Sequence, residues 1–231
     1  MSKPSRLLDQ IIKSGRKLLL EPEAKTVCQD YDIPVTRFKL AKNEEEAVKY
    51  AEAIGFPVVM KIVSPDIIHK SDVGGVIVGV KAVKEVRNSY KEIMKNVAKH
   101  KADAQIVGIL VQEMAPAGTE VIVGSTKDPQ FGPALMFGLG GIFVEVLKDV
   151  TFRIAPITEA EACEMISEVK AYPLLKGYRN TPPADLKAIA KILTNTSKMV
   201  MDYPEIKELD LNPIIVYEKG AKTVDARIIL E

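Results

Sequence analysis

The chain has 231 residues, enough for one large domain or two small ones with a core that needs neither disulfides nor metal. Apolar residues make up 47% and charged residues 27%, as in packed globular proteins, so disorder over most of the chain is excluded. The 32 Lys and Arg residues against 31 Asp and Glu residues give a formal net charge of +1, which leaves no electrostatic footprint for nucleic acid or an anionic membrane.

The cysteines and the apolar runs indicate the compartment. Cys28 and Cys163 are far apart and lack CxxC spacing, so we expect neither a disulfide framework nor a cysteine zinc site. Residues 1–20 mix basic and apolar side chains, and no apolar run approaches the ~20 residues of a membrane span. We therefore expect a cytoplasmic protein that is neither exported nor membrane-spanning.

The first half of the chain alternates helices and strands. The apolar spacing predicts helices near residues 7–12, 23–31, 44–54 and 84–99, and strands over 35–40, 58–63, 76–83 and 106–114. Asn43, with Glu46 three residues later, predicts a capped helix start. A polar loop, residues 64–75, joins two of the strands.

Strands dominate the second half. Turns rich in Gly, Pro and Asp predict antiparallel strands over 120–126, 133–139 and 151–157, followed by a final strand pair over 209–216 and 223–230. Thr158 with Glu161 predicts a capping box for a helix to residue 170, and Asp185 begins a helix to about residue 201. The strand that ends near residues 111–117 gives way to Ala-Pro-Ala-Gly, a candidate hinge with sheet on both sides.

Lys61 lies in the apolar strand 58–63, where an ammonium is costly unless an anion meets it. A nucleotide phosphate would supply that anion. A carboxylate on a neighbouring strand would do so equally well.

His69 is one of two histidines and lies in the loop 64–75. An imidazole near Asp66 or Asp72 could be held in one tautomer, which suits general base work or transient phosphorylation. An exposed histidine without a role is the alternative. In the same loop Gly74 and Gly75 allow backbone amides to approach a phosphate, although a Gly pair between strands is more often a turn.

Two further segments carry polar side chains at predicted strand ends. The glycines at 138, 140 and 141 are followed by Glu145 and Arg153, a set that suits phosphate and metal handling. The segment from Gln112 to Glu120 could present a backbone N–H and C=O to an adenine edge while Glu120 reaches a ribose hydroxyl. An ordinary turn with a surface carboxylate is the alternative.

Oxygen ligands gather on the final strand pair. Asp210 and Asn212 lie in the first strand, and Asp225 is expected inside the second, apolar strand. Hard oxygen ligands on adjacent strands suit Mg²⁺. A chance collection of such residues at two exposed strand ends is the alternative.

Taken in order, these segments resemble an ATP-grasp fold, and within it the nucleotide-binding β subunit of the ADP-forming acetate–CoA ligases, relatives of succinyl-CoA synthetase. The resemblance runs from about residue 20 to the end and rests on five motifs: GFPVVMK at 55–61, IHKSDVGG at 68–75, GLGG at 138–141, YPLLKGYR at 172–179 and LDLNP at 209–213. It implies two α+β subdomains with the nucleotide in the cleft between them. The expected divisions are an extension over 1–19, an N-terminal subdomain over 20–112 and a C-terminal subdomain over 113–231.

The resemblance implies a reversible reaction in which acyl-CoA, ADP and phosphate give the free acid, CoA and ATP through an acyl phosphate and phosphohistidines. His69 matches the loop histidine that carries the phosphoryl group to ADP. The implied nucleotide contacts are Lys61, Gly74 and Gly75 with Arg153 for the phosphates, Glu113 and Ala115 for adenine and Glu120 for ribose. Asn212 and Asp225 match the Mg²⁺ ligands.

No GxGxxG follows a predicted strand, so a CoA-binding Rossmann unit is missing and a separate α subunit is implied, with an α2β2 heterotetramer expected. Two other functions are compatible with the sequence. One is an ATP-grasp carboxylate–amine ligase that modifies no histidine; the other is a non-catalytic subunit that senses nucleotide.

Overall fold

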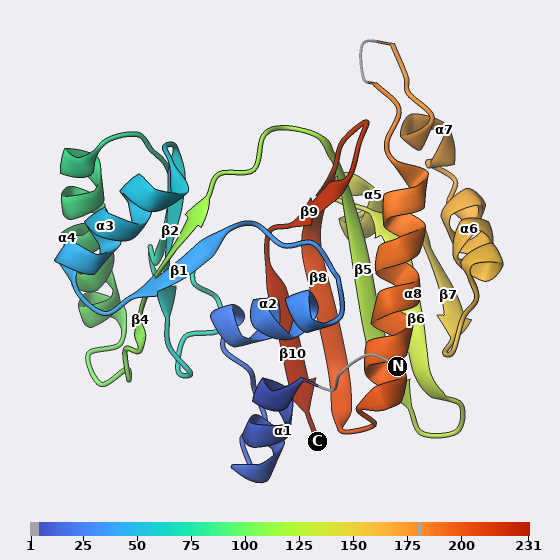
Figure 1. The fold of residues 1–231 in the computed structure, drawn as a ribbon, viewed down its shortest axis with the longest axis horizontal. Helices are drawn as coiled ribbons and strands as arrows, with labels where there is room; N and C mark the ends of the chain where they lie inside the picture. The colour runs from blue at the N-terminus through green and yellow to red at the C-terminus, as the bar shows by residue number, and fades with distance from the viewer. Residues whose placement is uncertain (1–4, 180–181) are drawn as a thin grey trace. The chain divides into compact units, whose positions relative to one another are not determined.

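The computed structural model describes residues 5–179 and 182–231 and divides the chain into two compact units (Figure 1). The smaller unit is Thr36–Pro116. The larger unit combines the chain up to Val35 with Ala117–Glu231. Each unit has its own sheet, its own helices and its own apolar core, so the fold is α+β as the sequence predicts.

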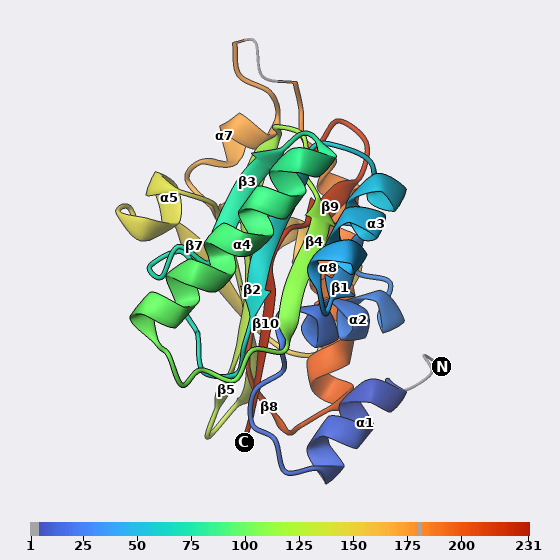
Figure 2. The ribbon, with the colours of Figure 1, turned by 90° about the vertical axis from the view of Figure 1, so that its left-hand side faces the viewer.

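The smaller unit contains a four-stranded antiparallel sheet in the order β1-β4-β2-β3. Its elements are β1 (Phe38–Ala41), α3 (Glu44–Ile54), β2 (Val58–Val63), β3 (Val76–Val80), α4 (Val83–His100) and β4 (Gly108–Glu113). Helices α3 and α4 pack on the sheet, and Figure 2 shows α4 lying across β2 and β3. Met60, Ile62 and Val111 point toward these helices and form the core with Val86 and Ile93 of α4.

The larger unit contains a six-stranded antiparallel sheet in the order β10-β8-β5-β6-β7, with β9 paired to β8. Its strands are β5 (Thr119–Asp128), β6 (Gly132–Leu139), β7 (Val150–Ile154), β8 (Ile206–Val216), β9 (Ala221–Thr223) and β10 (Ala226–Leu230). Its helices are α1 (Arg6–Lys13), α2 (Glu21–Asp30), α5 (Ile142–Glu145), α6 (Glu159–Glu168), α7 (Tyr172–Leu175) and α8 (Leu186–Asp202).

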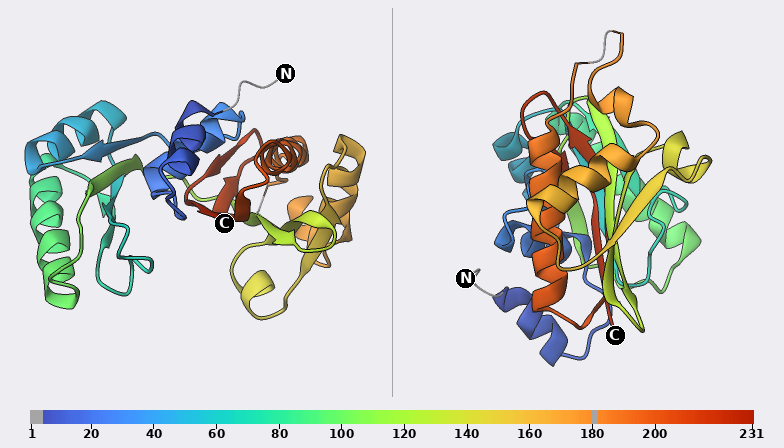
Figure 3. Two further views of the ribbon diagram at one scale, coloured as in Figure 1. Left: turned by 90° about the horizontal axis from the view of Figure 1, so that it is seen from below. Right: turned by 90° about the vertical axis from the view of Figure 1, so that its right-hand side faces the viewer.

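Side-chain alternation gives this sheet two different faces. One face carries buried apolar residues such as Leu135 and Leu209 and is covered by α6 and α8, which the right-hand view of Figure 3 shows in front of the strands. The residues between them point the other way: Gly124 pairs with both Met136 and Asp210, and Met136 pairs with Phe152. Asp210 of β8 therefore lies on the face without α6 and α8.

Residues 20–35 pack with the larger unit, whereas the sequence assigned them to the subdomain 20–112. Ala24, Val27 and Cys28 of α2 are buried in the core of the larger unit because α2 packs against β10. Single β-bridges join Leu18 to Ile229 and Val35 to Thr223. The chain therefore enters the smaller unit only at residue 36.

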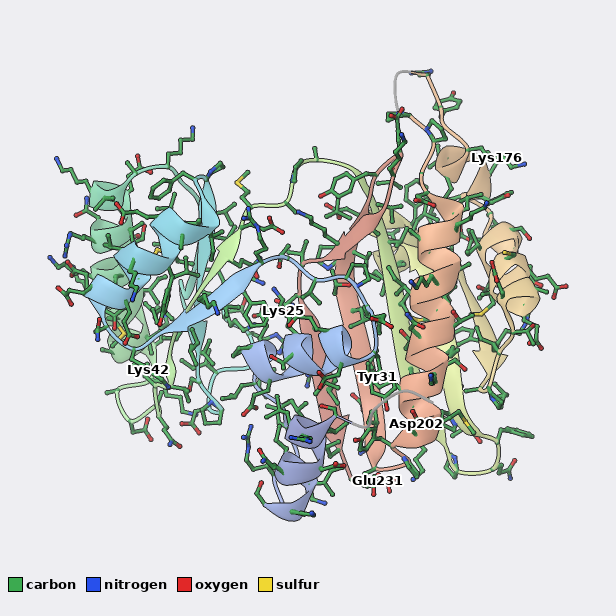
Figure 4. All side chains as sticks on the ribbon, in the orientation of Figure 1. Lys25, Tyr31, Lys42, Lys176, Asp202 and Glu231 are labelled. Atoms are coloured by element: carbon green, nitrogen blue, oxygen red, sulfur yellow. The ribbon has the colours of Figure 1, made fainter. Side chains whose placement is uncertain are left out.

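Two tyrosines fasten the N-terminal helices to α8. The Tyr31 hydroxyl donates to an Asp202 carboxylate oxygen at 2.9 Å, and Figure 4 shows these two residues at neighbouring ends of α2 and α8. The Tyr203 hydroxyl donates to Ser5 O at 3.1 Å and lies 3.0 Å from Asp9 Oδ1. Residues 1–4 of the predicted extension 1–19 lie outside the described residues.

The predicted helix caps are confirmed. The side chains of Asn43, Thr158 and Asp185 accept the N–H groups of Glu46, Glu161 and Ala188. The prediction of one strand over 223–230 is wrong, because the chain leaves β9 after Thr223 and begins β10 at Ala226. Within the described residues, no helix combines the length and apolar character needed to cross a membrane.

Candidate functional site

Lys61 is buried in the middle of β2, with 6% of its surface exposed. It lies opposite Leu110 on β4 and Val76 on β3. Since side chains alternate along a strand, its ammonium points to the face opposite Met60 and Ile62, away from the helices of the smaller unit. The sequence thus correctly predicts a buried strand that carries one ammonium.

Glu113 ends β4 and is bound to Arg37. Its carboxylate accepts the Arg37 backbone N–H at 3.0 Å and the Arg37 Nε–H at 2.9 Å, while its own N–H donates to Arg37 O at 2.9 Å. The Glu113 carboxylate is therefore engaged with Arg37. Ala115, two residues on, is half-buried.

His69 is exposed in the segment between β2 and β3, residues 64–75, here called the histidine loop. The Asp66 carboxylate, which the sequence offered as a partner for the imidazole, instead accepts the Gln105 N–H at 2.7 Å.

The amides of Gly74 and Gly75 are bonded within the histidine loop. The Gly74 N–H donates to Ser71 O at 3.0 Å and the Gly75 N–H donates to Lys70 O at 2.8 Å, so neither amide is offered to a phosphate in this conformation. A Cβ at Gly75 would lie 2.5 Å from Ile62 Cγ2 and 2.9 Å from Lys70 O. Glycine is needed here because the base of the histidine loop closes tightly against β2.

Polar side chains line a groove on the face of the larger unit's sheet that lacks α6 and α8. The groove encloses about 340 Å³, and its polar lining includes Asp210 and Asn212 of β8 and Arg227 of β10. Burial raises the pKa of Asp210, the Asp225 carboxylate raises it further, and Arg227 lowers it. Asp225 lies in the break between β9 and β10 rather than inside a strand, and its carbonyl accepts the Asn212 N–H at 3.3 Å. The two predicted metal ligands are therefore neighbours.

A second cavity, of about 270 Å³, surrounds Glu120 at the start of β5. Gly140 forms one wall: its N–H donates to Glu120 O at 2.8 Å, and a Cβ there would lie 2.8 Å from Glu120 Cβ. Phe143 and Tyr178 also line this cavity. The sequence singled out the motif around Tyr178 but gave that residue no role.

Arg153 is not brought to these cavities. It lies opposite Leu135 in the β6–β7 pair, so it points toward the face covered by α6. There its guanidinium is paired with the carboxylate of Glu168 and lies 3.9 Å from that of Glu164. The nearby Glu145 has a side chain outside the described residues.

Sequence reasoning missed Asp149, which is buried with 6% exposure. Its carboxylate accepts the N–H groups of Lys170 and Ala171, each at 2.8 Å. Its own N–H donates to Phe143 O in α5 at 2.9 Å, so it joins α5 to the start of α7, and these two helices supply Phe143 and Leu174 to the Glu120 cavity. An Asp before a strand is common in surface turns, so no signal in the sequence marks it.

Among the described residues, no three His, Cys, Asp or Glu side chains are grouped closely enough to form a metal site by themselves. Asn212 and Asp225 nevertheless offer hard oxygen atoms beside Asp210. Mg²⁺ is commonly held by one or two carboxylates together with substrate phosphates and water. The donor set therefore fits a magnesium ion that arrives with a nucleotide.

The family model described as ATP-grasp domain matches residues 10–230. The chain is 55% identical over 218 residues to the Acetate--CoA ligase [ADP-forming] I subunit beta of Pyrococcus furiosus, a match that covers 94% of both chains. The chain belongs to the ATP-grasp β subunits of ADP-forming acetate–CoA ligases. This confirms the family and the fold that the sequence predicts.

Two solved structures from Ca. Korarchaeum cryptofilum are similar over 99% of this chain and 100% of theirs. One, 54% identical with a TM-score of 0.96, is a dinucleotide-forming acetyl-coenzyme A synthetase 1 in complex with coenzyme A, Ca-AMPCP and HgCl+. The other, 51% identical with a TM-score of 0.87, holds coenzyme A and Mg-AMPPCP and has its phosphohistidine segment pointing towards the nucleotide binding site.

Proposed function

We propose that this chain is the nucleotide-binding subunit of an ADP-forming acyl-CoA synthetase and transfers a phosphoryl group between His69 and ADP. The observation that carries the proposal is the position of His69. It is exposed in the middle of a loop whose flanking residues, Ile67 and Val73, pack on the core of the smaller unit. A relative 51% identical to this chain has a phosphohistidine segment.

The proposed step needs no reactant besides ADP and phosphohistidine. A β-phosphate oxygen of ADP attacks the phosphorus of phosphohistidine, a P–O bond forms as the N–P bond breaks, and the electron pair of the broken bond returns to the imidazole nitrogen. The products are ATP and free His69, and the reverse step charges His69 from ATP. Exposure on a loop suits His69 to meet both a phosphoryl donor and an acceptor.

Residues of both units are assigned to the nucleotide. Lys61 neutralises phosphate charge, main-chain groups of Glu113 and Ala115 receive the adenine edge, and Glu120 accepts hydrogen bonds from the ribose hydroxyls. The position of Lys61 supports its assignment, because its side chain points to the face of the smaller unit's sheet opposite Met60 and Ile62, away from α3 and α4. The Glu120 cavity, with Gly140 against its wall, supports the ribose assignment.

Asn212 and Asp225 are assigned as the protein ligands of Mg²⁺. When bound, the ion neutralises charge that develops on the transferring phosphoryl group. The carboxylate of Asp210 lies close enough to Asp225 for its pKa to rise, so a cation here would also relieve the repulsion between the two carboxylates.

We further infer a CoA-binding α subunit as partner, an α2β2 heterotetramer and a cytoplasmic location. The first inference is supported by the name of the Pyrococcus furiosus relative, which is a subunit beta. Thioester synthesis by the isolated chain would contradict the inferred division of labour.

Labelling with ATP that carries ³²P at the γ-phosphate tests the proposal. His69→Ala removes the proposed carrier, and His100→Ala is a matched control because His100 is the only other histidine and is exposed at the end of α4. With Mg²⁺, we expect acid-labile, base-stable label in wild type and His100→Ala and none in His69→Ala. Equal label in His69→Ala, or none in wild type even with the α subunit present, would refute the carrier role.

A further inference from the structure

Asp66 bonds the start of the histidine loop to neighbouring residues of the smaller unit through its N–H, its carbonyl oxygen and its carboxylate. Its N–H donates to Ser64 Oγ at 3.1 Å, and its carbonyl oxygen accepts from Lys101 Nζ at 3.2 Å. Its carboxylate accepts the Gln105 N–H at 2.7 Å. Asp66 thereby joins the start of the loop to the connection between α4 and β4.

The far end of the loop is fixed by Asn96 of α4. Asn96 Nδ2 donates to Gly74 O at 3.2 Å. A Cβ at Gly74 would lie 2.7 Å from the same Nδ2 atom, and Gly74 has a φ of +62°, a conformation that favours glycine. The side chain of Asn96 therefore lies directly against the loop backbone.

Between these two points the packing of the loop changes. Ile67 and Val73 pack on the core of the smaller unit, but Ile68, with 55% of its surface exposed, and His69 do not. His69 lies two residues after Ile67, so while Ile67 stays packed it can move at most about 7 Å from that Cα. Removing the Asp66 side chain breaks the bond to the Gln105 N–H, although Ser64 and Ile67 on either side stay buried.

We propose that Asp66 and Asn96 are positioning residues for phosphoryl transfer: they fix the two points about which the segment carrying His69 moves. The inference rests on the proposed function of His69. Without the Asp66 carboxylate the start of the loop is no longer bonded to the Gln105 N–H, so the direction in which the loop presents His69 to a reaction centre is less restricted. A loss of orientation at the reacting group lowers the rate of transfer.

The isosteric variants of the two residues should differ: one keeps the hydrogen bond that holds the loop and the other loses it. Asp66→Asn keeps an acceptor oxygen for the Gln105 N–H, whereas Asp66→Ala removes it. Asn96→Asp loses the donor to Gly74 O and is expected to behave as Asn96→Ala. Asp103→Ala is the matched control, because Asp103 is an exposed carboxylate in the same α4–β4 connection.

The measurements are the single-turnover rate of His69 phosphorylation by Mg-ATP in the full chain and the ADP affinity. We expect Asp66→Ala to slow phosphorylation about tenfold, with Asp66→Asn, Asp103→Ala and all ADP affinities within about twofold of wild type. An Asp66→Ala rate equal to wild type would overturn the proposal. So would an Asp66→Asn rate as slow as that of Asp66→Ala, which would show that the negative charge matters rather than the acceptor oxygen.

Hydrogen exchange at the Gln105 amide separates this inference from the proposed function, because it needs no phosphorylation. The amide should be protected in wild type and Asp66→Asn and exchange faster in Asp66→Ala. Unchanged protection in Asp66→Ala would overturn the inference even if His69 carries phosphate. Absence of label in wild type would count against the proposed function instead.

Discussion

Replacing Asp149 by Ala is expected to destabilise the larger unit far more than removing an equally hydrogen-bonded carboxylate at the surface. Asp149 accepts the N–H groups of Lys170 and Ala171 at 2.8 Å. Asp128 offers a matched comparison in the same unit, because one of its carboxylate oxygens accepts the N–H groups of Gln130 and Phe131 at 2.8 and 2.9 Å. The two carboxylates differ in burial, since the Asp128 turn is open to solvent.

The expected difference in the free energy of unfolding depends on whether water can bond to the N–H groups once the carboxylate is removed. A hydrogen bond to a charged group contributes roughly 1.5–3 kcal/mol, and a buried donor left without a partner loses that contribution in full. Ala171 is buried whereas Lys170 can regain water, so Asp149→Ala should cost about 2–4 kcal/mol. At the exposed turn water replaces both bonds, and Asp128→Ala should cost about 0.5–1 kcal/mol.

Urea unfolding followed by a probe in the larger unit measures both variants in the same transition. For a unit of this size each 1 kcal/mol lowers Tm by roughly 2–4 °C, so thermal scans should separate the variants as well. ADP affinity should also fall in Asp149→Ala, because Phe143 and Leu174 of the Glu120 cavity lie on α5 and α7, which Asp149 joins. Equal losses of stability in the two variants would refute the argument from burial.

Two further predictions test the site and its acid sensitivity. Lys61→Ala should weaken ADP binding about 10- to 100-fold by calorimetry, because a charge-assisted bond to phosphate is lost, whereas Arg153→Ala should change it less than about twofold. Comparable weakening in both variants would contradict the placement of Arg153 on the face covered by α6. The N–H of Gly220, followed by that of Ala188, lowers the pKa of Asp185. Its contribution to stability is therefore complete above the unfolded pKa near 4 and is lost as the pH falls through the lower folded value. Asp185→Asn should reduce the drop in urea midpoint between about pH 6 and pH 3, and an unchanged drop would argue against this assignment.

The sequence predicts most helices and strands because their signals are local. The caps at Asn43, Thr158 and Asp185 act over three residues, and the strand 58–63 is apolar throughout except for Lys61. Such features need no knowledge of the partner element. The grouping of residues 20–35 was not predictable in this way, because it depends on α2 packing against β10, some 200 residues away in the chain.

Where the structure places the predicted site residues has a related explanation. The residue types and their order place Asp210, Asn212 and Asp225 together, because two strands that pair bring their ends together. The prediction for Arg153 depends on which face of β7 it occupies, and a shift of one residue reverses that face. Only the register opposite Leu135 shows that Arg153 points toward α6.

The residues that no motif marks share one feature: their partners are main-chain N–H groups brought close by tertiary structure. Asp66 accepts from Gln105 and Asp149 accepts from Lys170 and Ala171, and any loop could supply such donors. Residues proposed to perform chemistry, such as His69 and Lys61, must carry a particular functional group. A sequence motif therefore identifies them by residue type. A residue that holds a loop in place needs only an acceptor at the right point, so its role emerges when the donor's position is known. This is why the anchors of the histidine loop follow from the structure, whereas His69 follows from the sequence.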